Sequence, residues 1–441
     1  MSAKDRGRDE YVDTCRGVAC VLLVAYHAIG ASVGSGLHVA GDSFWRNFAD
    51  GLIYFRMPMF SFLSGVVYAW RPFTAGNGTH FLLGKMRRLL LPMLVVGTAF
   101  AFVQSNTPGV NVPPVNWATL HIFPLAHYWF SEALFIIFIV VMTLESLNLL
   151  ESLRSFLIIL AFAAIMHLTI SPPGEFGLWG ANYLFPFFLS GLGCSRFRIA
   201  KIDFLPIYIA VLVGTSSYVI AGILGYVART DRVSIIALLL GVSACFSLLV
   251  SGWKNRTLAF IGFYSYAIYL FHVFFTASTR MFLYSMNLKN VTALVIVATA
   301  AGVVGPILIE KIADRFALTR TLLLGKAARK GRKRKPVTPG GLHDIPAAAA
   351  RLGVTEEKLR AFVRDGELKY VNVGHGAKRP RYRFTDSDIN ELIEKRRQQD
   401  VPQCQSTSPK SPRRIICSTS YSTVVGLTAL RAAQLAGKLK R

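Results

Sequence analysis

Residues 13–30 read DTCRGVACVLLVAYHAIG, an apolar run in which an arginine and a histidine, Arg16 and His27, stand out. A run of this length and character is typical of a helix that crosses a bilayer. In a helix these two residues differ by only about 20° in facing and by about 16 Å along the axis. Because an arginine inside a span costs about +2.5–3.5 kcal/mol on insertion, such residues are candidates for a function.

The same apolar character recurs along most of the chain. Of 441 residues, 53% are hydrophobic and only 17% are charged, against about 25% charged in a typical soluble domain. This composition excludes a disordered chain. Ten stretches are long enough to cross a bilayer, and they centre near Leu23, Met59, Val96, Phe135, Leu160, Phe188, Leu212, Leu239, Tyr269 and Val297. We therefore predict an all-α polytopic membrane protein with about ten transmembrane helices in a lipid bilayer.

The connectors between these stretches predict an orientation. Lysine and arginine gather after the second, sixth and eighth stretches, at Arg71, Lys85, Arg87 and Arg88, at Arg196, Arg198 and Lys201, and at Lys254 and Arg256. Residues 104–121 and 171–180 contain neither residue type. Since basic connectors stay in the cytoplasm, we expect a multi-pass protein of the plasma membrane with both termini cytoplasmic.

Each polar residue of the first span also has a structural interpretation. Arg16 alone could extend to the cytoplasmic headgroups, and Asp13 precedes it on nearly the same face. His27 alone could be a hydrogen-bonded packing residue. Their shared face favours a functional role for both. The six cysteines show no regular spacing, and no Cys/His cluster has the spacing of a zinc site, so we expect no metal.

The second span places Arg56 far from both interfaces, where it should face a polar cavity or a carboxylate partner. Asp50 and Glu132 are the candidate counter-ions. Pro58 and Gly65 indicate a break in this helix that would expose backbone groups to the same cavity.

Lys85, Arg87 and Arg88 open the third span from the cytoplasmic side. They are either a positive-inside anchor or a seat for the phosphates of a cytosolic donor such as acyl-CoA. In the ninth span, His272 has three interpretations, catalytic, structural or a substrate contact, of which we favour the last two.

Six segments together resemble the integral-membrane acyltransferase 3 family. In order they are DTCRGVACVLLVAYH (13–27), FRMPMFSFLSG (55–65), KMRRLLLP (85–92), YWFSEALFIIF (128–138), NYLFPFFLSGLG (182–193) and IGFYSYAIYLFH (261–272). The resemblance covers about residues 8–320. The chain departs from the family pattern at residues 13–15 and in the basic motif, which has a lysine as well as two arginines.

The resemblance implies an O-acyltransferase. It would move an acyl group, usually acetyl, from acyl-CoA to a hydroxyl of a saccharide or glycolipid, with acyl-CoA as a co-substrate and no permanently bound cofactor. His27 would act as the general base or as the nucleophile that forms a transient acyl-imidazole. Arg16 would orient the surroundings of His27 or hold the donor, and Arg56 would stabilise the oxyanion. Lys85, Arg87 and Arg88 would hold the phosphates.

The chain changes character after Gly325. Up to that residue it has 23 Lys and Arg against 14 Asp and Glu, and after it 26 against 10. Residues 326–341 read as a basic linker and residues 342–400 as a small globular domain. Residues 401–441 are rich in Ser, Thr and basic residues, and we expect disorder there.

Residues 342–400 predict helix, turn, helix, hairpin and helix. The first two helices are expected at 345–352 and 356–364, with Thr355 as the N-cap between them. Strands are expected at 369–373 and 381–384, and Asp386 is expected to cap the last helix. The segment resembles an excisionase or MerR-type winged helix-turn-helix, which would make DNA a partner. The expected DNA contacts are Lys358, Arg360 and Arg364 on the second helix and Lys378, Arg379, Arg381 and Arg383 on the wing.

Two other functions compete with the enzyme. One is a membrane transporter that uses Arg16, His27 and Arg56 as a relay, although no internal repeat is visible. The other is a membrane-anchored DNA-binding regulator. The C-terminal domain could instead mediate a protein interaction or be the remnant of a fusion.

Overall fold

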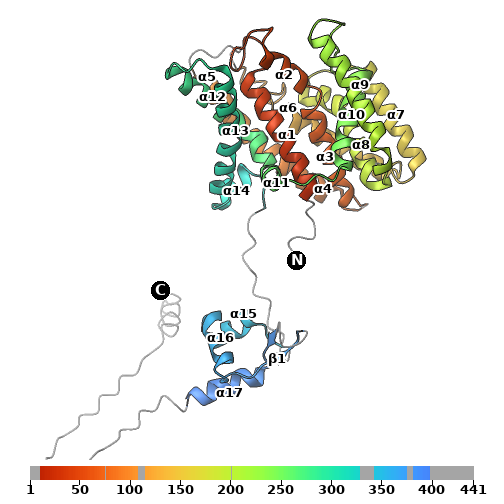
Figure 1. Cartoon of the computed structure of the whole chain (residues 1–441). Helices are drawn as coiled ribbons and strands as arrows, with labels where there is room; N and C mark the ends of the chain where they lie inside the picture. Colours follow the sequence, from red (N-terminus) through yellow and green to blue (C-terminus); the bar gives the residue numbers. More distant parts are fainter. Residues whose placement is uncertain are drawn as a thin grey trace, which may run out of the picture. The chain divides into compact units, whose positions relative to one another are not determined.

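The computed structural model describes residues 10–74, 76–107, 115–199, 201–327, 342–374 and 381–397. They divide into two compact units, with the boundary after Lys330. The larger unit is a group of helices, and the smaller one carries a short hairpin with three helices (Figure 1).

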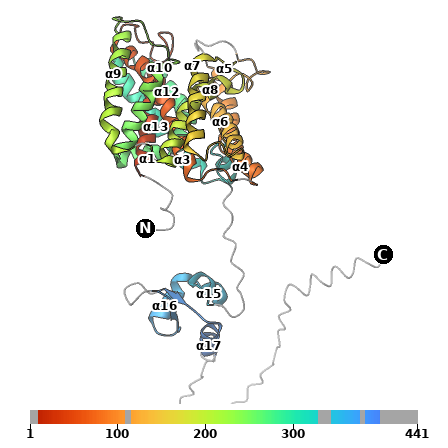
Figure 2. The same cartoon turned by 90° about the vertical axis from the view of Figure 1, so that its right-hand side faces the viewer.

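Helices make up the regular structure of the larger unit (Figure 2). The α-helices are α1 (Glu10–Ile29), α2 (Phe44–Leu52), α3 (Arg56–Trp70), α4 (Gly78–Lys85), α5 (Leu91–Ser105), α6 (Trp129–Ser146), α7 (Leu153–Thr169), α8 (Leu178–Phe197), α9 (Leu205–Ile223), α10 (Ile235–Val250), α11 (Arg256–Phe263), α12 (Ser265–Ser285), α13 (Val291–Ala313) and α14 (Ala317–Leu322). A π-helical turn, η1 (Met86–Leu90), joins α4 to α5, and the 3₁₀ turns η2 (Glu175–Gly177) and η3 (Ile202–Phe204) precede α8 and α9.

The membrane character of this unit is confirmed, but the count of ten spans is not. Among the described residues, six helical stretches are long and apolar enough to cross a membrane. A seventh arises if α11 and α12, which meet at 81°, count as one broken span. The shorter apolar helices α7 and α10 fall below the length required.

The break predicted within the second span is absent from the described helix α3. Helix α3 runs without interruption from Arg56 to Trp70, so neither Pro58 nor Gly65 breaks it. Pro58 is the third residue of the helix, where a missing N–H group has no intrahelical partner to lose. The interruption is the turn at residues 53–55, between α2 and α3.

Glycines set the distance between α3 and α8, the most extensively packed helix pair. A Cβ atom added at Gly65 would lie 2.0 Å from the carbonyl oxygen of Phe188. One added at Gly191 would lie 1.9 Å from the carbonyl oxygen of Phe62. Small residues allow this close approach of backbones, which is how membrane helices gain packing energy without a hydrophobic driving force.

A second pair of glycines joins α1 to α11. A Cβ at Gly17 would lie 2.0 Å from the carbonyl oxygen of Leu258, and one at Gly262 would lie 1.9 Å from that of Asp13. The helix with His27 and the helix with Arg56 are therefore both held by backbone contact with a neighbour.

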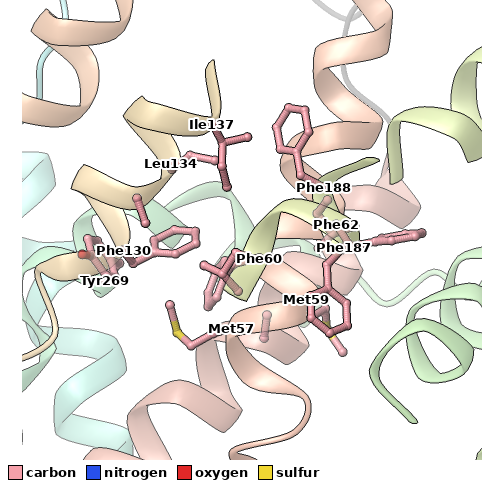
Figure 3. Packing of buried hydrophobic residues seen from close by; sticks show 14 of the residues in the cluster. Met57, Met59, Phe60, Phe62, Phe130, Leu134, Ile137, Phe187, Phe188 and Tyr269 are labelled. Carbon is pink, nitrogen blue, oxygen red and sulfur yellow. The ribbon is translucent and has the colours of Figure 1, made fainter. Parts of the chain in front are cut away.

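Aromatic and methionine side chains fill the space between α3, α6, α8 and α12 (Figure 3). Phe130 contacts Phe60 and Tyr269, with ring centroids 6.0 Å and 5.5 Å apart. The residues of this cluster are buried and apolar, so they offer no hydrogen bonds to neighbouring polar groups. Those polar groups must find partners elsewhere inside the unit or on a ligand.

The smaller unit contains α15 (Ile345–Leu352), α16 (Glu356–Arg364), β1 (Val371–Asn372), β2 (Tyr382–Arg383) and α17 (Asp386–Arg397). The bounds predicted for the first two helices are confirmed. Thr355 caps α16 through a hydrogen bond from the N–H of Lys358, and Gly353 ends α15 with φ 67°. The strands are antiparallel, pair Val371 with Arg383, and are shorter than predicted.

The cap predicted for the last helix is wrong by one residue. Thr385 is the N-cap, because its hydroxyl accepts from the N–H of Asp388 while the Asp388 carboxylate accepts from Thr385. This reciprocal pair is a capping box. Asp386 accepts hydrogen bonds from His343 and Arg351 instead, which ties the two ends of the domain together.

Candidate functional site

Three imidazoles meet inside the helical unit. The ring centroid of His27 lies 4.9 Å from that of His272 and 5.7 Å from that of His127, and His127 and His272 are 4.7 Å apart. The side chains come from the last turns of α1, the segment before α6, and the middle of α12. Residues a hundred or more positions apart thus form one polar cluster within an apolar core.

Tyrosines hold His127 in this cluster. The hydroxyl of Tyr269 donates to the backbone carbonyl of His127 at 2.9 Å, and the hydroxyl of Tyr128 donates to that of Leu270 at 3.0 Å. The preceding residue, Ala126, has φ 48°, a left-handed conformation that residues with a side chain adopt only rarely. Such strain persists where the surroundings impose it, often at functional sites.

Several ring nitrogens of the cluster have no hydrogen-bond partner within the described parts of the chain. His272 Nδ1 lies 2.9 Å and 3.0 Å from the carbonyls of Ile268 and Tyr269. A carbonyl only accepts, so Nδ1 carries the proton, and Nε2 of the neutral ring is then an acceptor. Nε2 of His272, Nε2 of His27 and both nitrogens of His127 are buried without a hydrogen-bond partner among the described residues. Buried polar atoms in this state are unusual and indicate an interaction with a substrate or water.

Arg56 lies beside the three imidazoles. Its guanidinium carbon is 3.7 Å from the centroid of the Tyr26 ring, a cation–π distance. The Tyr26 ring lies against that of His27, with ring centroids 5.2 Å apart. Nε of Arg56 is buried and has no hydrogen-bond partner in the described parts of the chain. The site thus combines imidazoles with a cation, the groups that acyl transfer needs for moving a proton and for stabilising an oxyanion.

The predicted counter-ions do not pair with Arg56. Asp50 accepts from Arg46, with a nitrogen–oxygen distance of 2.8 Å, and lies 3.6 Å from Arg229. Glu132 is buried at the start of α6, with one carboxylate oxygen unpartnered among the described residues, and no ion pair joins it to Arg56. The guanidinium of Arg56 contacts the Tyr26 ring, where the sequence analysis expected a carboxylate partner.

Arg16 lies away from this site. Its side chain pairs with Asp13 at 3.2 Å, one helical turn before it. His27 is three turns further along α1, so the two residues share a face but occupy different depths. Arg56 thus reaches the imidazole cluster, and Arg16 stays toward the start of α1.

The basic motif is divided among different surroundings. The Lys85 ammonium lies 3.4 Å from the Phe138 ring centroid, Arg87 is half-buried with an unpartnered Nε in the described region, and Arg88 is exposed. Both arginines lie in the π-helical turn η1, and such turns are frequent at functional sites. The hydroxyl of Tyr266 donates to the carbonyl of Leu89 in the same turn at 2.9 Å, so α12 connects this turn to the imidazole cluster.

His127 is the residue of this site that sequence reasoning missed. The available signal was its position directly before the YWFSEALFIIF segment, at the end of a connector. His272, expected to be structural or a substrate contact, does anchor to backbone carbonyls but also belongs to the cluster. Among the described residues, no group of His, Cys, Asp or Glu is arranged to hold a metal ion.

In the smaller unit, the predicted DNA contacts that fall within the described residues lie at its surface. Lys358, Arg360, Arg364 and Arg381 are exposed, and Arg383 is half-buried with a hydrogen bond to the carbonyl of Tyr382. Lys378 and Arg379 lie outside the described residues. Arg360 and Arg364 are one turn apart on the same face of α16.

Two family models match the chain. One described as an acyltransferase domain matches residues 9–311, and one described as a helix-turn-helix domain matches residues 344–397. No curated protein and no solved structure matches it. The first model spans well over half of the chain and includes His27, Arg56, His127 and His272. The chain therefore belongs to this family of membrane acyltransferases, with a helix-turn-helix domain after the catalytic unit.

Proposed function

We propose that the protein is an O-acyltransferase that moves an acyl group, in the first instance acetyl, from cytoplasmic acyl-CoA to a hydroxyl of a cell-surface saccharide or glycolipid. The observation that carries the proposal is the buried cluster of His27, His127 and His272 beside Arg56. Acyl transfer to a weak nucleophile such as a hydroxyl needs a base and a group that stabilises an oxyanion, and the cluster contains a candidate for each.

The chemistry follows from the residues of the cluster. His27 takes the proton of the acceptor hydroxyl while the oxygen of that hydroxyl attacks the thioester carbonyl carbon. Arg56 stabilises the negative charge that develops on the carbonyl oxygen. The carbon–sulfur bond then breaks, and the departing thiolate takes the proton back from His27. In a second route, a nitrogen of His27 attacks the thioester carbonyl carbon, the carbon–sulfur bond breaks and the thiolate leaves, which gives an acyl-imidazole. The acceptor oxygen then attacks the acyl carbon, the carbon–nitrogen bond breaks, and the proton of the hydroxyl passes to the thiolate.

The donor would enter from the basic end of the unit. Arg87 and Arg88, near the start of the third apolar segment, would contact its phosphates, while Lys85 is held by the Phe138 ring. His27 lies about 16 Å along α1 from Arg16, so the acyl arm would have to extend over that depth. In this arrangement the acceptor reaches the imidazoles from the opposite end, where α1 ends and α3 begins.

The test is acyl transfer by the full chain and by His27→Ala, His127→Ala and His272→Ala. Membranes are supplied with radiolabelled acetyl-CoA, and surface glycans and glycolipids are analysed by mass for an added acyl unit. His80→Ala is the matched control, because His80 is exposed on α4. We expect His27→Ala to lose transfer while inserting normally. Wild-type transfer by that variant would remove His27 from the mechanism.

A second function is supported for the C-terminal domain. We propose that α16 enters a DNA groove, because Arg360 and Arg364 share an exposed face beside the capped turn.

A truncated chain tests which unit carries the acyl transfer. Truncation after Ala327 keeps the ion pair of Lys326 with Glu310 intact. Full acyl transfer by the truncated chain assigns the enzyme to the membrane unit alone, whereas loss of transfer would make the C-terminal domain part of the catalytic function.

A further inference from the structure

The end of the membrane unit folds back onto the turn that carries Arg87 and Arg88. Residues 320–327, which we call the C-terminal hook, run from the last residues of α14 to the end of the described part of this unit. A Cβ atom added at Gly325 would lie 2.4 Å from the carbonyl oxygen of Arg87 and 2.7 Å from the Cα atom of Arg88. The backbone of the hook is therefore in contact with the backbone of η1. The mechanism above gives the hook no role.

The wide turn of η1 explains how the hook can come so close. The N–H of Leu91 donates to the carbonyl of Met86, five residues before it, which is the π-helical pattern. In this pattern the donor to Arg87 would be Pro92, which has no N–H. The carbonyl of Arg87 thus lacks the partner that the turn would give it, and it lies against Gly325 instead.

The hook is itself held in place. The N–H of Gly325 donates to the carbonyl of Thr321 at 3.0 Å. The ammonium of Lys326 lies 2.7 Å from the carboxylate of Glu310 and 3.1 Å from that of Asp314, at the end of α13. Gly325 has φ 60°, a backbone conformation that glycine adopts without strain. These contacts fix the hook to α13, so it acts as a firm support for η1.

Helix α12 holds η1 at a second point. The hydroxyl of Tyr266 donates to the carbonyl of Leu89, the residue after Arg88, at 2.9 Å. The Tyr266 ring packs against that of Tyr269, with centroids 6.2 Å apart and planes 25° apart. The backbone of the two arginines is therefore bracketed by the hook on one contact and by α12 on the other.

The two guanidinium groups remain able to bind an anion. Arg87 is half-buried, and its Nε has no hydrogen-bond partner in the described region, while Arg88 is exposed. Consecutive side chains lie closer in facing in a π turn than in an α-helix, because each turn contains more residues. Two adjacent guanidinium groups suit a diphosphate. The two carboxylates that contact the hook are balanced by two of its cations, Lys326 and Arg320.

We propose that Gly325 and Tyr266 are positioning residues of the donor site, which hold η1 so that Arg87 and Arg88 bind the diphosphate of acyl-CoA together. This inference rests on the proposed acyltransferase function and adds the elements that fix its phosphate site. A side chain at position 325 would push η1 away from the hook, and loss of the Tyr266 hydroxyl would release the turn at Leu89. Because both changes act at the phosphate end of the donor, they lower its affinity and leave the rate at saturating donor unchanged.

The test compares acetyl-CoA with S-acetylpantetheine, which carries the same thioester but no phosphate. Binding of each to the full chain in lipid nanodiscs is measured by ligand-observed NMR without an acceptor. We expect Gly325→Ala to bind acetyl-CoA about tenfold more weakly, the effect of losing one charge-assisted contact, and S-acetylpantetheine as the wild type does. In the transfer assay, KM for acetyl-CoA should rise by the same factor while kcat is unchanged.

Two matched controls isolate the contacts with η1. Gly252 has φ 61° against 60° at Gly325, but in the described part of the chain no atom lies within 4 Å of a Cβ added there. Gly252→Ala therefore carries the same backbone strain without the contact. Tyr266→Phe removes only a hydroxyl and carries the test if Gly325→Ala does not fold. Its control is Tyr284→Phe, since Tyr284 donates to the carbonyl of Leu37 at the same 2.9 Å from the other end of α12.

The outcomes separate this proposal from the proposed function. Equal affinity of the wild type for both probes, an equal loss for both probes in Gly325→Ala, or a Tyr266→Phe chain that binds acetyl-CoA as Tyr284→Phe does would overturn the positioning roles. If transfer occurs and Gly325→Ala behaves as Gly252→Ala, the proposed function stands and the role of Gly325 fails. If the wild type binds acetyl-CoA through its phosphates and Gly325→Ala weakens that binding, but no acyl group is transferred, the proposed function fails and the positioning roles stand.

Discussion

Replacing Gly65 by alanine tests whether backbone contact between α3 and α8 positions the site. The added Cβ would lie 2.0 Å from the carbonyl oxygen of Phe188. A carbon–oxygen contact normally needs about 3.3 Å, so the helices must separate by about 1.3 Å at this crossing. The atom that the Cβ would meet belongs to the backbone of Phe188, so no flexible side chain can move to absorb the strain.

The magnitude of the effect follows from this shift. Overpacking of a well-packed core costs about 1–3 kcal/mol. Arg56 begins the same helix, and a misplacement of about 1 Å at a catalytic group can reduce a rate by about 10²-fold. We therefore expect Gly65→Ala to lower both the thermal stability in detergent and the rate of acyl transfer.

The control for this prediction is Gly214→Ala. Gly214 is also within a helix, α9, but has no atom within 4 Å of an added Cβ. Alanine there should be neutral or stabilising by up to about 1 kcal/mol. The reasoning is refuted if Gly65→Ala retains wild-type stability and transfer, or if both variants lose them equally.

Three further predictions concern contacts in different parts of the chain. Tyr269→Phe leaves the buried carbonyl of His127 without its donor. The free energy of unfolding should fall by about 1–3 kcal/mol, and acyl transfer should fall as well. Thermal unfolding and the transfer assay measure these changes, and an unchanged melting temperature would contradict the prediction. Arg196→Ala removes the guanidinium that lies 2.5 Å from the Glu145 carboxylate and leaves that part-buried group with the Tyr68 hydroxyl as a remaining donor. The expected cost is about 3 kcal/mol, measured by thermal unfolding, and a substitution of Glu145 to Gln in the same chain should partly restore the stability. Arg360→Ala should reduce the slope of log affinity for DNA against log salt by about one, measured by gel shift at several salt concentrations, and an unchanged slope would exclude Arg360 as a phosphate contact.

Local rules were sufficient for the helices of the small domain. Thr355 and Gly353 act on the backbone within a few residues of themselves, so α15 and α16 begin and end where expected. The choice of an N-cap from residue type was wrong for Asp386, because Thr385 next to it is also a residue type that caps helices and accepts the N–H of Asp388. Pro58 was misread for a related reason: its effect depends on whether it stands in the first turn of a helix.

By itself, the sequence determined the membrane class and the helix-turn-helix domain, and it made His27 and Arg56 candidates for a function, because the cost of placing an ionisable group among lipid tails depends on residue type and local hydrophobicity. The tertiary structure alone decided that His127 and His272 join His27, that Tyr26 rather than Asp50 faces Arg56, and that Arg16 stays apart. These contacts join segments far apart in the chain, and they depend on how closely the glycines let the helices approach.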